Sequence, residues 1–195
     1  MTIIWDVDDV LNALTHDWFH HEWLPSHPEC RLDYAGLTQN PPHRILGVEE
    51  ITYLRSLDKY RLSSHARAAR PVPDIQAWFQ KHGAGCSHIA LTARPLATVP
   101  PLAAWLFEHF GLWIRAFGFV PSARPNCLAP ACHAGKGDWL KWISAGDIFV
   151  DDNPQNIEQA AALGLKTILI PQPWNKAGDT LPEALNSLAH VAGLC

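Results

Sequence analysis

Short apolar runs alternate with longer segments of helical periodicity through most of the chain. Five runs have the length and the continuous apolar character of strands buried in a parallel sheet: 3–5, 88–92, 114–120, 148–150 and 167–170. Between and after them, apolar residues recur every three or four positions, which predicts helices over 73–82, 100–110, 138–144, 154–163 and a last one after Thr180. This alternation predicts an α/β fold, a three-layer Rossmann-like parallel sheet covered by helices on both faces.

The segment 12–70 interrupts the alternation of strands and helices. Val48, Ile51, Leu54 and Leu57 recur there at helical spacing, and prolines punctuate the rest of the segment. We therefore predict a small helical cap over residues 12–70, inserted after the first strand. Residues 1–11 and 71–195 are predicted to form the core.

Several aromatic residues have predicted positions within this core. Phe107 is expected to belong to the apolar stripe of the helix over 100–110, and Trp139 and Trp142 are expected to pack the helix over 138–144 onto the sheet. The chain has nine tryptophans and eleven histidines, more than a core of this size requires. The aromatic residues outside the predicted core are therefore candidates for contact with a flat ligand.

Composition and charge exclude several classes of protein. The chain has 195 residues, of which 48% are hydrophobic, and a net charge of only -4, so it is not a disordered chain. It has neither the basic surface of a protein that binds nucleic-acid duplexes nor a polybasic membrane anchor. No apolar stretch approaches the ~20 residues of a membrane span. Asp6, Asp8 and Asp9 interrupt the place where a signal peptide would be apolar.

The cysteines favour a reducing compartment. They are five in number, widely scattered and without a Cys-x-x-Cys pair, so we expect reduced thiols and a cytoplasmic protein. Cys127, Cys132 and His133 form the one cluster of soft ligands. An ordinary loop is favoured there over a zinc site, because zinc sites usually have four ligands with tighter pairing.

Polar residues gather where the predicted strands end. Asp6, Asp8 and Asp9 follow the first strand, Thr92 and Arg94 close the second, and Asp151 and Asp152 close the fourth, while Lys136 begins the helix before it. The carboxyl ends of parallel strands share one edge, where ligands of such sheets bind. Five carboxylates crowded at one edge require a cation, and oxygen ligands favour Mg²⁺.

These residue types suit phosphoryl transfer. Asp6 can attack phosphorus to form an acyl phosphate, and Asp8, on the same side of the strand, can protonate the leaving oxygen and later deprotonate water. Thr92 can donate to the phosphoryl oxygens, and Lys136 can offset charge. We expect Asp151 to be the direct Mg²⁺ ligand, with Asp152 binding through water or orienting Lys136.

The same residues, in this order, resemble the motifs of the haloacid dehalogenase (HAD) superfamily of phosphatases. Residues 3–10 are similar to its first motif, 89–92 to the second, Lys136 to the third and 148–152 to the fourth. The resemblance implies that Asp6 is the nucleophile, that Asp8 is the acid/base and that the Asp8 backbone carbonyl also ligates Mg²⁺. The second acidic residue of the first motif separates the chain from true dehalogenases.

Two points about the motifs stay open: the role of Asp9 and the identity of the lysine in the third motif. Many members of the superfamily have glycine where Asp9 stands, so Asp9 is either a solvated extra carboxylate or a contact to substrate or metal. The lysine of the third motif is Lys136 or Lys141. We prefer Lys136, because it begins a helix at a glycine-flanked turn from which a side chain can reach the site.

The cap carries the indications about substrate. In the superfamily such an insertion covers the site, and within it the chain resembles the 5'(3')-deoxyribonucleotidase group through 151–156 and 173–176. Trp18 and His20, on the predicted first cap helix, and Trp174 would then contact a base, although packing within the cap is the favoured explanation for Trp18. Arg94 could hold a phosphate oxygen or pair with a carboxylate. Four cap arginines could contact a substrate anion, although each is more typical of a solvated surface: Arg44, Arg61, Arg67 and Arg70.

The sequence thus predicts a Mg²⁺-dependent phosphomonoester hydrolase acting on a small phosphorylated substrate through an aspartyl phosphate. A nucleoside monophosphate is the first substrate to consider, and a sugar phosphate or another small metabolite is the alternative. A catalytically silent phosphate-binding protein on the same fold is the alternative from another class. The sequence does not indicate an oligomeric state.

Overall fold

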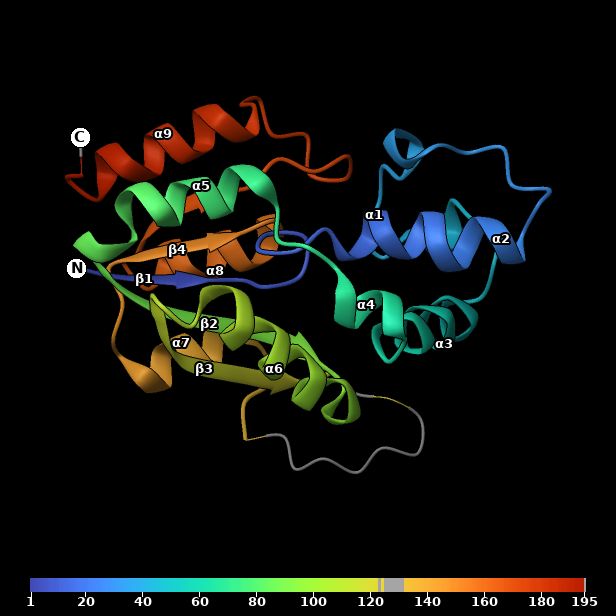
Figure 1. Ribbon diagram of the computed structural model, residues 1–195, viewed down its shortest axis with the longest axis horizontal. Helices are drawn as coiled ribbons and strands as arrows, with labels where there is room; N and C mark the ends of the chain where they lie inside the picture. Colours follow the sequence, from blue (N-terminus) through green and yellow to red (C-terminus); the bar gives the residue numbers. More distant parts are fainter. Residues whose placement is uncertain (123, 125–131, 195) are drawn as a thin grey trace.

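A five-stranded parallel sheet forms the centre of the structure, a computed structural model that describes residues 1–122, 124 and 132–194 (Figure 1). Its strands lie in the order β3-β2-β1-β4-β5. They are β1 (Thr2–Trp5), β2 (Ser87–Arg94), β3 (Ile114–Pro121), β4 (Ile148–Asp151) and β5 (Lys166–Leu169). Every neighbouring pair is parallel, which confirms the predicted α/β fold.

Helices cover both faces of the sheet because successive side chains of a strand point to opposite sides. Ile3, Trp5 and Val150 pack into the layer formed with α5 (Pro73–His82), α6 (Val99–Phe110) and α9 (Leu181–Val191). Ile4 and Phe149 pack into the opposite layer, with α7 (Lys136–Ile143) and α8 (Pro154–Ala162). Both faces of the central strands are therefore buried, and the polar residues of the predicted site lie at or just beyond the carboxyl ends of these strands.

The segment after β1 forms a helical cap that lies beyond the carboxyl ends of the strands (Figure 1). Its elements are α1 (Leu14–Trp18), a π-helical turn η1 (Phe19–Trp23), α2 (Leu24–Ser26), the short turns η2 (Tyr34–Gly36) and η3 (Pro42–Arg44), α3 (Glu50–Arg61) and α4 (Ser64–Ala68). The cap has a hydrophobic cluster of its own: Leu14, Trp18, Phe19, Trp23, Leu37, Tyr53, Leu57 and Tyr60. The chain leaves the core and returns to it side by side, since the Val72 N–H donates to the Leu11 carbonyl at 3.0 Å.

Two aromatic residues lie on the surface, contrary to expectation. Phe107 is 46% exposed, because Trp105 and Leu106 take the inward positions of α6 and the next residue is rotated by about 100° away from them. Trp142 is 66% exposed, since Trp139 and Leu140 form the buried side of α7. Tryptophan content alone is thus a poor guide to which face of a helix is inward.

Two further expectations concern membranes and the cysteine cluster. In the described ranges, no helix has both the length and the apolar character that crossing a membrane requires. Cys127, one member of the candidate soft-ligand cluster, lies outside the described residues, and Cys132 is exposed.

Candidate active site

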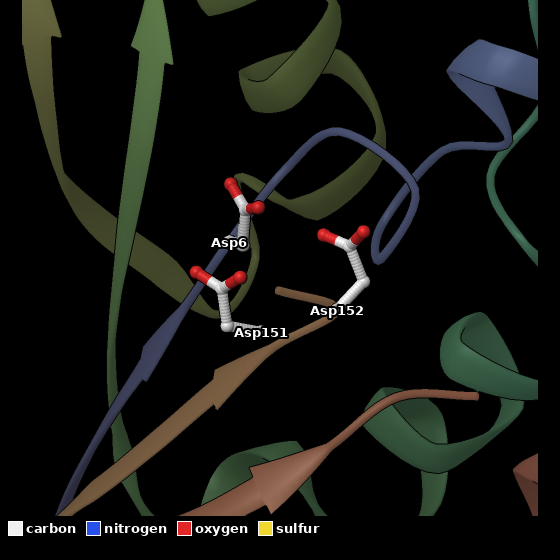
Figure 2. A group of neighbouring side chains, drawn as sticks. All are labelled: Asp6, Asp151 and Asp152. Atoms are coloured by element: carbon white, nitrogen blue, oxygen red, sulfur yellow. The ribbon is translucent and has the colours of Figure 1, made fainter. Parts of the chain in front are cut away.

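The two acidic clusters meet because β1 and β4 are neighbours in the sheet. Trp5 pairs with Val150, and the Asp6 N–H extends the ladder by donating to the Val150 carbonyl at 2.8 Å. This register brings Asp6 beside Asp151 and Asp152 (Figure 2). Each of the three residues has a carboxylate oxygen within 4.8 Å of the others, which is close enough to share one cation.

Lys136 neutralises part of this negative charge. It is the first residue of α7, and its Nζ lies 2.7 Å from Oδ1 of Asp6 and 2.7 Å from Oδ2 of Asp151. Burial alone would lower the pKa of Lys136, but the two carboxylates raise it well above its usual range, so the ammonium stays charged. Lys141, the alternative for the third motif, is exposed on the same helix.

Asp151 is fully buried and its carboxylate has a full set of hydrogen bonds. Oδ1 accepts from the Asn153 N–H at 2.8 Å and from Asn156 Nδ2 at 3.1 Å. Oδ2 accepts from Asn156 Nδ2 at 3.1 Å and from Lys136 at 2.7 Å. A carboxylate has about four acceptor positions, so these donors use most of the acceptor capacity of Asp151.

Asp152 has the opposite arrangement. Its Oδ2 accepts from the indole Nε1 of Trp174 at 2.8 Å, and its Oδ1 accepts no hydrogen bond from the described residues. Asn175 Nδ2 donates to the Asp152 backbone carbonyl at 2.8 Å, which fixes the turn. Burial and the charge of Asp151 raise the pKa of Asp152 well above its ordinary value, and a nearby cation would reverse that shift. Asp152 therefore has a carboxylate oxygen without a hydrogen-bond partner among the described residues, whereas both oxygens of Asp151, the residue that we expected to bind Mg²⁺ directly, accept hydrogen bonds.

Asp6 is held in place by its own backbone neighbour as well as by Lys136. The Val7 N–H donates to Oδ1 at 2.7 Å, and Oδ2 accepts no hydrogen bond from the described residues. Burial, with the nearby charges of Asp151 and Asp152, raises the pKa of Asp6 well above its ordinary value, and Lys136 opposes the rise. The Asp6 carboxylate thus needs positive charge to remain ionised.

The Asp8 carboxylate pairs with two arginines. Arg94 binds it through two atoms, Nε at 2.7 Å from Oδ2 and Nη2 against Oδ1, and Arg61 of the cap adds Nη2 at 3.2 Å. Asn12 Nδ2 donates to Oδ1 at 3.3 Å. Burial would raise the pKa of Asp8, but the two guanidinium groups outweigh it and lower the pKa to about 2. Arg94 was expected to bind either a phosphate or a carboxylate. In the structure it binds the carboxylate of Asp8.

Asp9 is buried and joins the loop after β1 to the first cap helix. Its two carboxylate oxygens accept from the Thr15 N–H at 2.7 Å and the Thr15 hydroxyl at 2.6 Å. Burial raises the pKa of Asp9 to about 7, although the bonds from Thr15 oppose the rise. The alternative of a solvated carboxylate is thus wrong. The φ of Asp9 is 61°, in the left-handed region that glycine adopts most easily, which explains why glycine suits this position.

A cavity of about 190 Å³ lies between these groups and the cap. The core contributes Asp6, Asp8, Asp9, Thr92, Ala93, Lys136, Asp152, Asn153 and Asn156, and the cap contributes Leu14, Thr15, Asn40, Tyr53, Leu57 and Arg61. Thr92 is 1% exposed, and its hydroxyl finds no hydrogen-bond partner among the described residues. An unpaired hydroxyl at a polar cavity indicates a place for a ligand atom or water.

Three residues predicted to contact substrate lie elsewhere. Trp18 is completely buried in the cap cluster, where its Nε1 donates to Ser56 Oγ at 3.0 Å, so the packing alternative holds for it. His20 is exposed and its ring packs at a tilt against that of His16, with ring centroids 4.4 Å apart. Trp174 contacts Asp152 rather than lining the cavity.

Other lining residues had no individual signal in the sequence. Asn156 stands three residues after the capping Asn153, a spacing that places both at the same end of α8 and could have indicated it. Tyr53 and Asn40 reach the cavity only because the cap folds over the strand ends. No local pattern could have identified them.

Comparison with known proteins supports the fold. No family model matches the chain, and no curated protein does. A haloacid dehalogenase-like hydrolase from Streptococcus pneumoniae superposes with a TM-score of 0.60 at 14% identity, over 97% of this chain and 97% of that one. A Thermotoga maritima protein described as a β-phosphoglucomutase gives 0.60 at 14%, over 97% and 99%. YfnB from Bacillus subtilis, described as a HAD hydrolase bound to magnesium, gives 0.60 at 11%, over 98% and 97%. The chain thus has the fold of the haloacid dehalogenase superfamily, as its sequence motifs predicted.

Proposed function

We propose that the protein is a Mg²⁺-dependent phosphomonoester hydrolase that works through an aspartyl phosphate on Asp6. The observation that carries the proposal is the floor of the cavity, where Asp6, the charged Lys136 and the unpaired hydroxyl of Thr92 lie together. A phosphoryl group needs a nucleophile, a cation and a hydrogen-bond donor, and these three side chains supply one of each.

The donor set fits a hard divalent cation. We propose that the Asp6 and Asp152 carboxylates hold Mg²⁺, together with the Asp8 backbone carbonyl that the motif resemblance implies, while Asp151 orients Lys136. This assignment follows from hydrogen bonding, because Asp152 has an oxygen without a partner among the described residues whereas both oxygens of Asp151 accept hydrogen bonds. When bound, Mg²⁺ supplies positive charge that offsets the carboxylates and the phosphate.

The side chains then divide the reaction in two steps. The Asp6 carboxylate attacks phosphorus, the ester bond to the leaving oxygen breaks, and Lys136 balances the charge of nucleophile and phosphate. Asp8 gives a proton to the leaving oxygen and afterwards takes one from the water that hydrolyses the aspartyl phosphate. Arg94 and Arg61 stabilise the ionised form of Asp8. At least one of these two contacts must therefore weaken before the Asp8 carboxylate can take up a proton.

The residues that line the cavity favour a substrate without a nucleotide base. Trp18 and His20, which suggested a nucleotide base, lie away from it, and Tyr53 is the aromatic residue in its wall. A small phosphorylated metabolite therefore has more support than a nucleoside monophosphate.

Hydrolysis of an aryl phosphate with and without Mg²⁺ tests the proposal. We expect turnover that requires Mg²⁺ and that Asp6→Asn abolishes, whereas Asp179→Asn, which changes an exposed aspartate, keeps full activity. Activity that survives exhaustive chelation, or that Asp6→Asn retains, would contradict it. Binding of inorganic phosphate without turnover of any ester would favour a silent phosphate-binding protein.

A further inference from the structure

A chain of ion pairs connects the cap to the floor of the cavity. At one end Arg94 binds Asp8 through Nε and Nη2. At the other end Arg124 binds Asp58 through Nε at 2.6 Å and Nη2 at 3.2 Å. Arg61, the last residue of α3, bridges the two carboxylates, with Nη1 at 3.0 Å from Asp58 and Nη2 at 3.2 Å from Asp8.

Arg61 is the member of this chain whose guanidinium is incompletely used. Nε and Nη2 form the edge of a guanidinium that grips a planar anion at two points, as both Arg94 and Arg124 do. In Arg61 that edge makes one contact, from Nη2, to a carboxylate that Arg94 already holds. Its Nε is buried and finds no hydrogen-bond partner among the described residues. Half of the edge is therefore available to another anion.

The position of Arg61 decides which part of a substrate it would meet. Its side chain lines the cavity from the cap, together with Tyr53 and Leu57 on the same helix. The groups proposed to take the transferred phosphoryl, Lys136 and Thr92, line the cavity from the core. A phosphomonoester seated on the core groups would therefore present its leaving group to the cap wall.

We propose that Arg61 determines specificity by binding a second anionic group, a carboxylate or a second phosphate, on the leaving group of the substrate. The inference rests on the proposed function and narrows its substrate class to small phosphomonoesters with two anionic groups. Binding would fill both atoms of the Arg61 edge and remove one of the two cations that hold Asp8, which stays paired with Arg94. A substrate without the second anion would leave Arg61 on Asp8.

Matched small esters test this inference. Carboxymethyl phosphate and 2-hydroxyethyl phosphate have similar size and differ in the second anion, and ethane-1,2-diol bisphosphate distinguishes a phosphate from a carboxylate. We expect wild-type kcat/KM to be at least ~10-fold higher for one of the two anionic esters than for the neutral one, as for a hydrogen bond to a charged group. Arg61→Gln should lower that anionic value by ~10- to 100-fold, mainly through KM, and should not lower the neutral one, because the neutral ester loses no contact and Asp8 loses one of the two cations that hold it.

The control is Arg55→Gln, which removes an exposed arginine from the same helix and should leave both values unchanged. Equal kcat/KM for the neutral and both anionic esters in the wild type would overturn the inference without any variant, as would an equal fall for all esters in Arg61→Gln. Failure of the proposed function would look different, since no ester would then be hydrolysed. Calorimetric binding of the anionic ester to Asp6→Asn, with and without Arg61→Gln, gives a readout independent of turnover.

Discussion

The two walls of the cavity are built in different ways. The core wall stands on central strands whose register is fixed by ladder hydrogen bonds, and Asp6 continues that ladder by its own N–H. The cap wall stands on α3, which belongs to a separate hydrophobic cluster and reaches the site through Arg61. We therefore expect the core wall to be the more rigid, and a movement of the cap wall to act on the site mainly through the contact between Arg61 and Asp8.

This difference assigns phosphoryl transfer to the core wall and the choice of substrate to the cap wall. The groups that we propose to act on phosphorus all come from the core wall, where each carboxylate has several fixed partners. The groups that face the leaving group come from the cap, which is joined to the core mainly by polar contacts such as Arg61–Asp8 and Thr15–Asp9. Variants in the core wall should accordingly change the rate for every substrate, and variants in the cap wall should change the preference between substrates.

Among substitutions of the residues around Asp6, Lys136→Ala should have the largest effect. We expect kcat/KM for an aryl phosphate to fall by about 10³-fold, since a group that offsets transition-state charge is lost. The free energy of unfolding should also fall by roughly 3 kcal/mol, because Asp6 and Asp151 lose their buried partner. Lys141→Ala, on the exposed side of the same helix, is the control and should match the wild type in both measurements. Unchanged turnover in Lys136→Ala would show that the core wall does not balance charge in this way.

The two aspartates after β4 should respond differently. Asp152→Asn is expected to raise the Mg²⁺ concentration for half-maximal activity by about 100-fold, because a direct ligand is weakened. Asp151→Asn should lower kcat by disturbing Lys136 while leaving the Mg²⁺ requirement within a few fold of wild type. Titration of activity with Mg²⁺ checks both. A large rise in the Mg²⁺ requirement of Asp151→Asn, with little change in Asp152→Asn, would show that Asp151 is the direct ligand.

Trp174→Phe should have a smaller effect through Asp152. The variant keeps an aromatic ring but loses the N–H that donates to Asp152 Oδ2, so the half-saturating Mg²⁺ concentration should rise by about tenfold. At saturating Mg²⁺, kcat should be unchanged within about twofold. Trp142→Phe alters an exposed ring and serves as the control. An unaltered Mg²⁺ requirement would mean that the indole does not position the ligand.

The smallest expected effect is on the pH dependence of stability, through a buried histidine in the sheet that carries the core wall. His88 on β2 is buried, accepts from Trp5 Nε1 at 3.1 Å and contacts the Gly83 carbonyl at 2.8 Å. Burial lowers the pKa of His88 below its ordinary value, so the unfolded state binds the proton more readily. The stability that His88 contributes is thus complete above its unfolded pKa and is lost as the pH falls through that value toward the folded one.

Wild-type protein without metal should therefore lose about 1 kcal/mol more stability than His88→Gln between about pH 7.5 and about pH 5.5. Urea unfolding at the two pH values measures the difference. His190→Gln changes an exposed histidine and should keep the wild-type slope. Identical slopes for all three proteins would exclude this role for His88.

The sequence predicted the core wall because its signals are local. Each of these strands is a short apolar run followed by polar residues. Because ligands bind at the carboxyl ends of parallel strands, these polar residues were predicted to form one site. The sequence could not predict the different hydrogen bonding of Asp151 and Asp152, because it depends on donors from α8 and from the loop at Trp174.

The cap wall was less predictable because its positions depend on tertiary structure. Four cap arginines looked alike, yet Arg44, Arg67 and Arg70 are exposed and Arg61 alone among the four is buried beside Asp8. Trp18 was a candidate ligand contact because it follows the loop that carries Asp6 and Asp8. In the structure its side chain lies on the buried side of the cap helices, within the cap cluster. The identity of a residue on an amphipathic helix does not say which face it occupies until the partner surfaces are known.

The central claim, an aspartyl phosphate on Asp6, can be tested by trapping that species. Reduction with borohydride during turnover converts an acyl phosphate of aspartate to homoserine, and peptide mass spectrometry locates the product. The account predicts conversion at position 6 that requires both Mg²⁺ and substrate and that leaves Asp8 and Asp9 unmodified. Turnover without conversion at position 6, or with conversion at another aspartate, would contradict it.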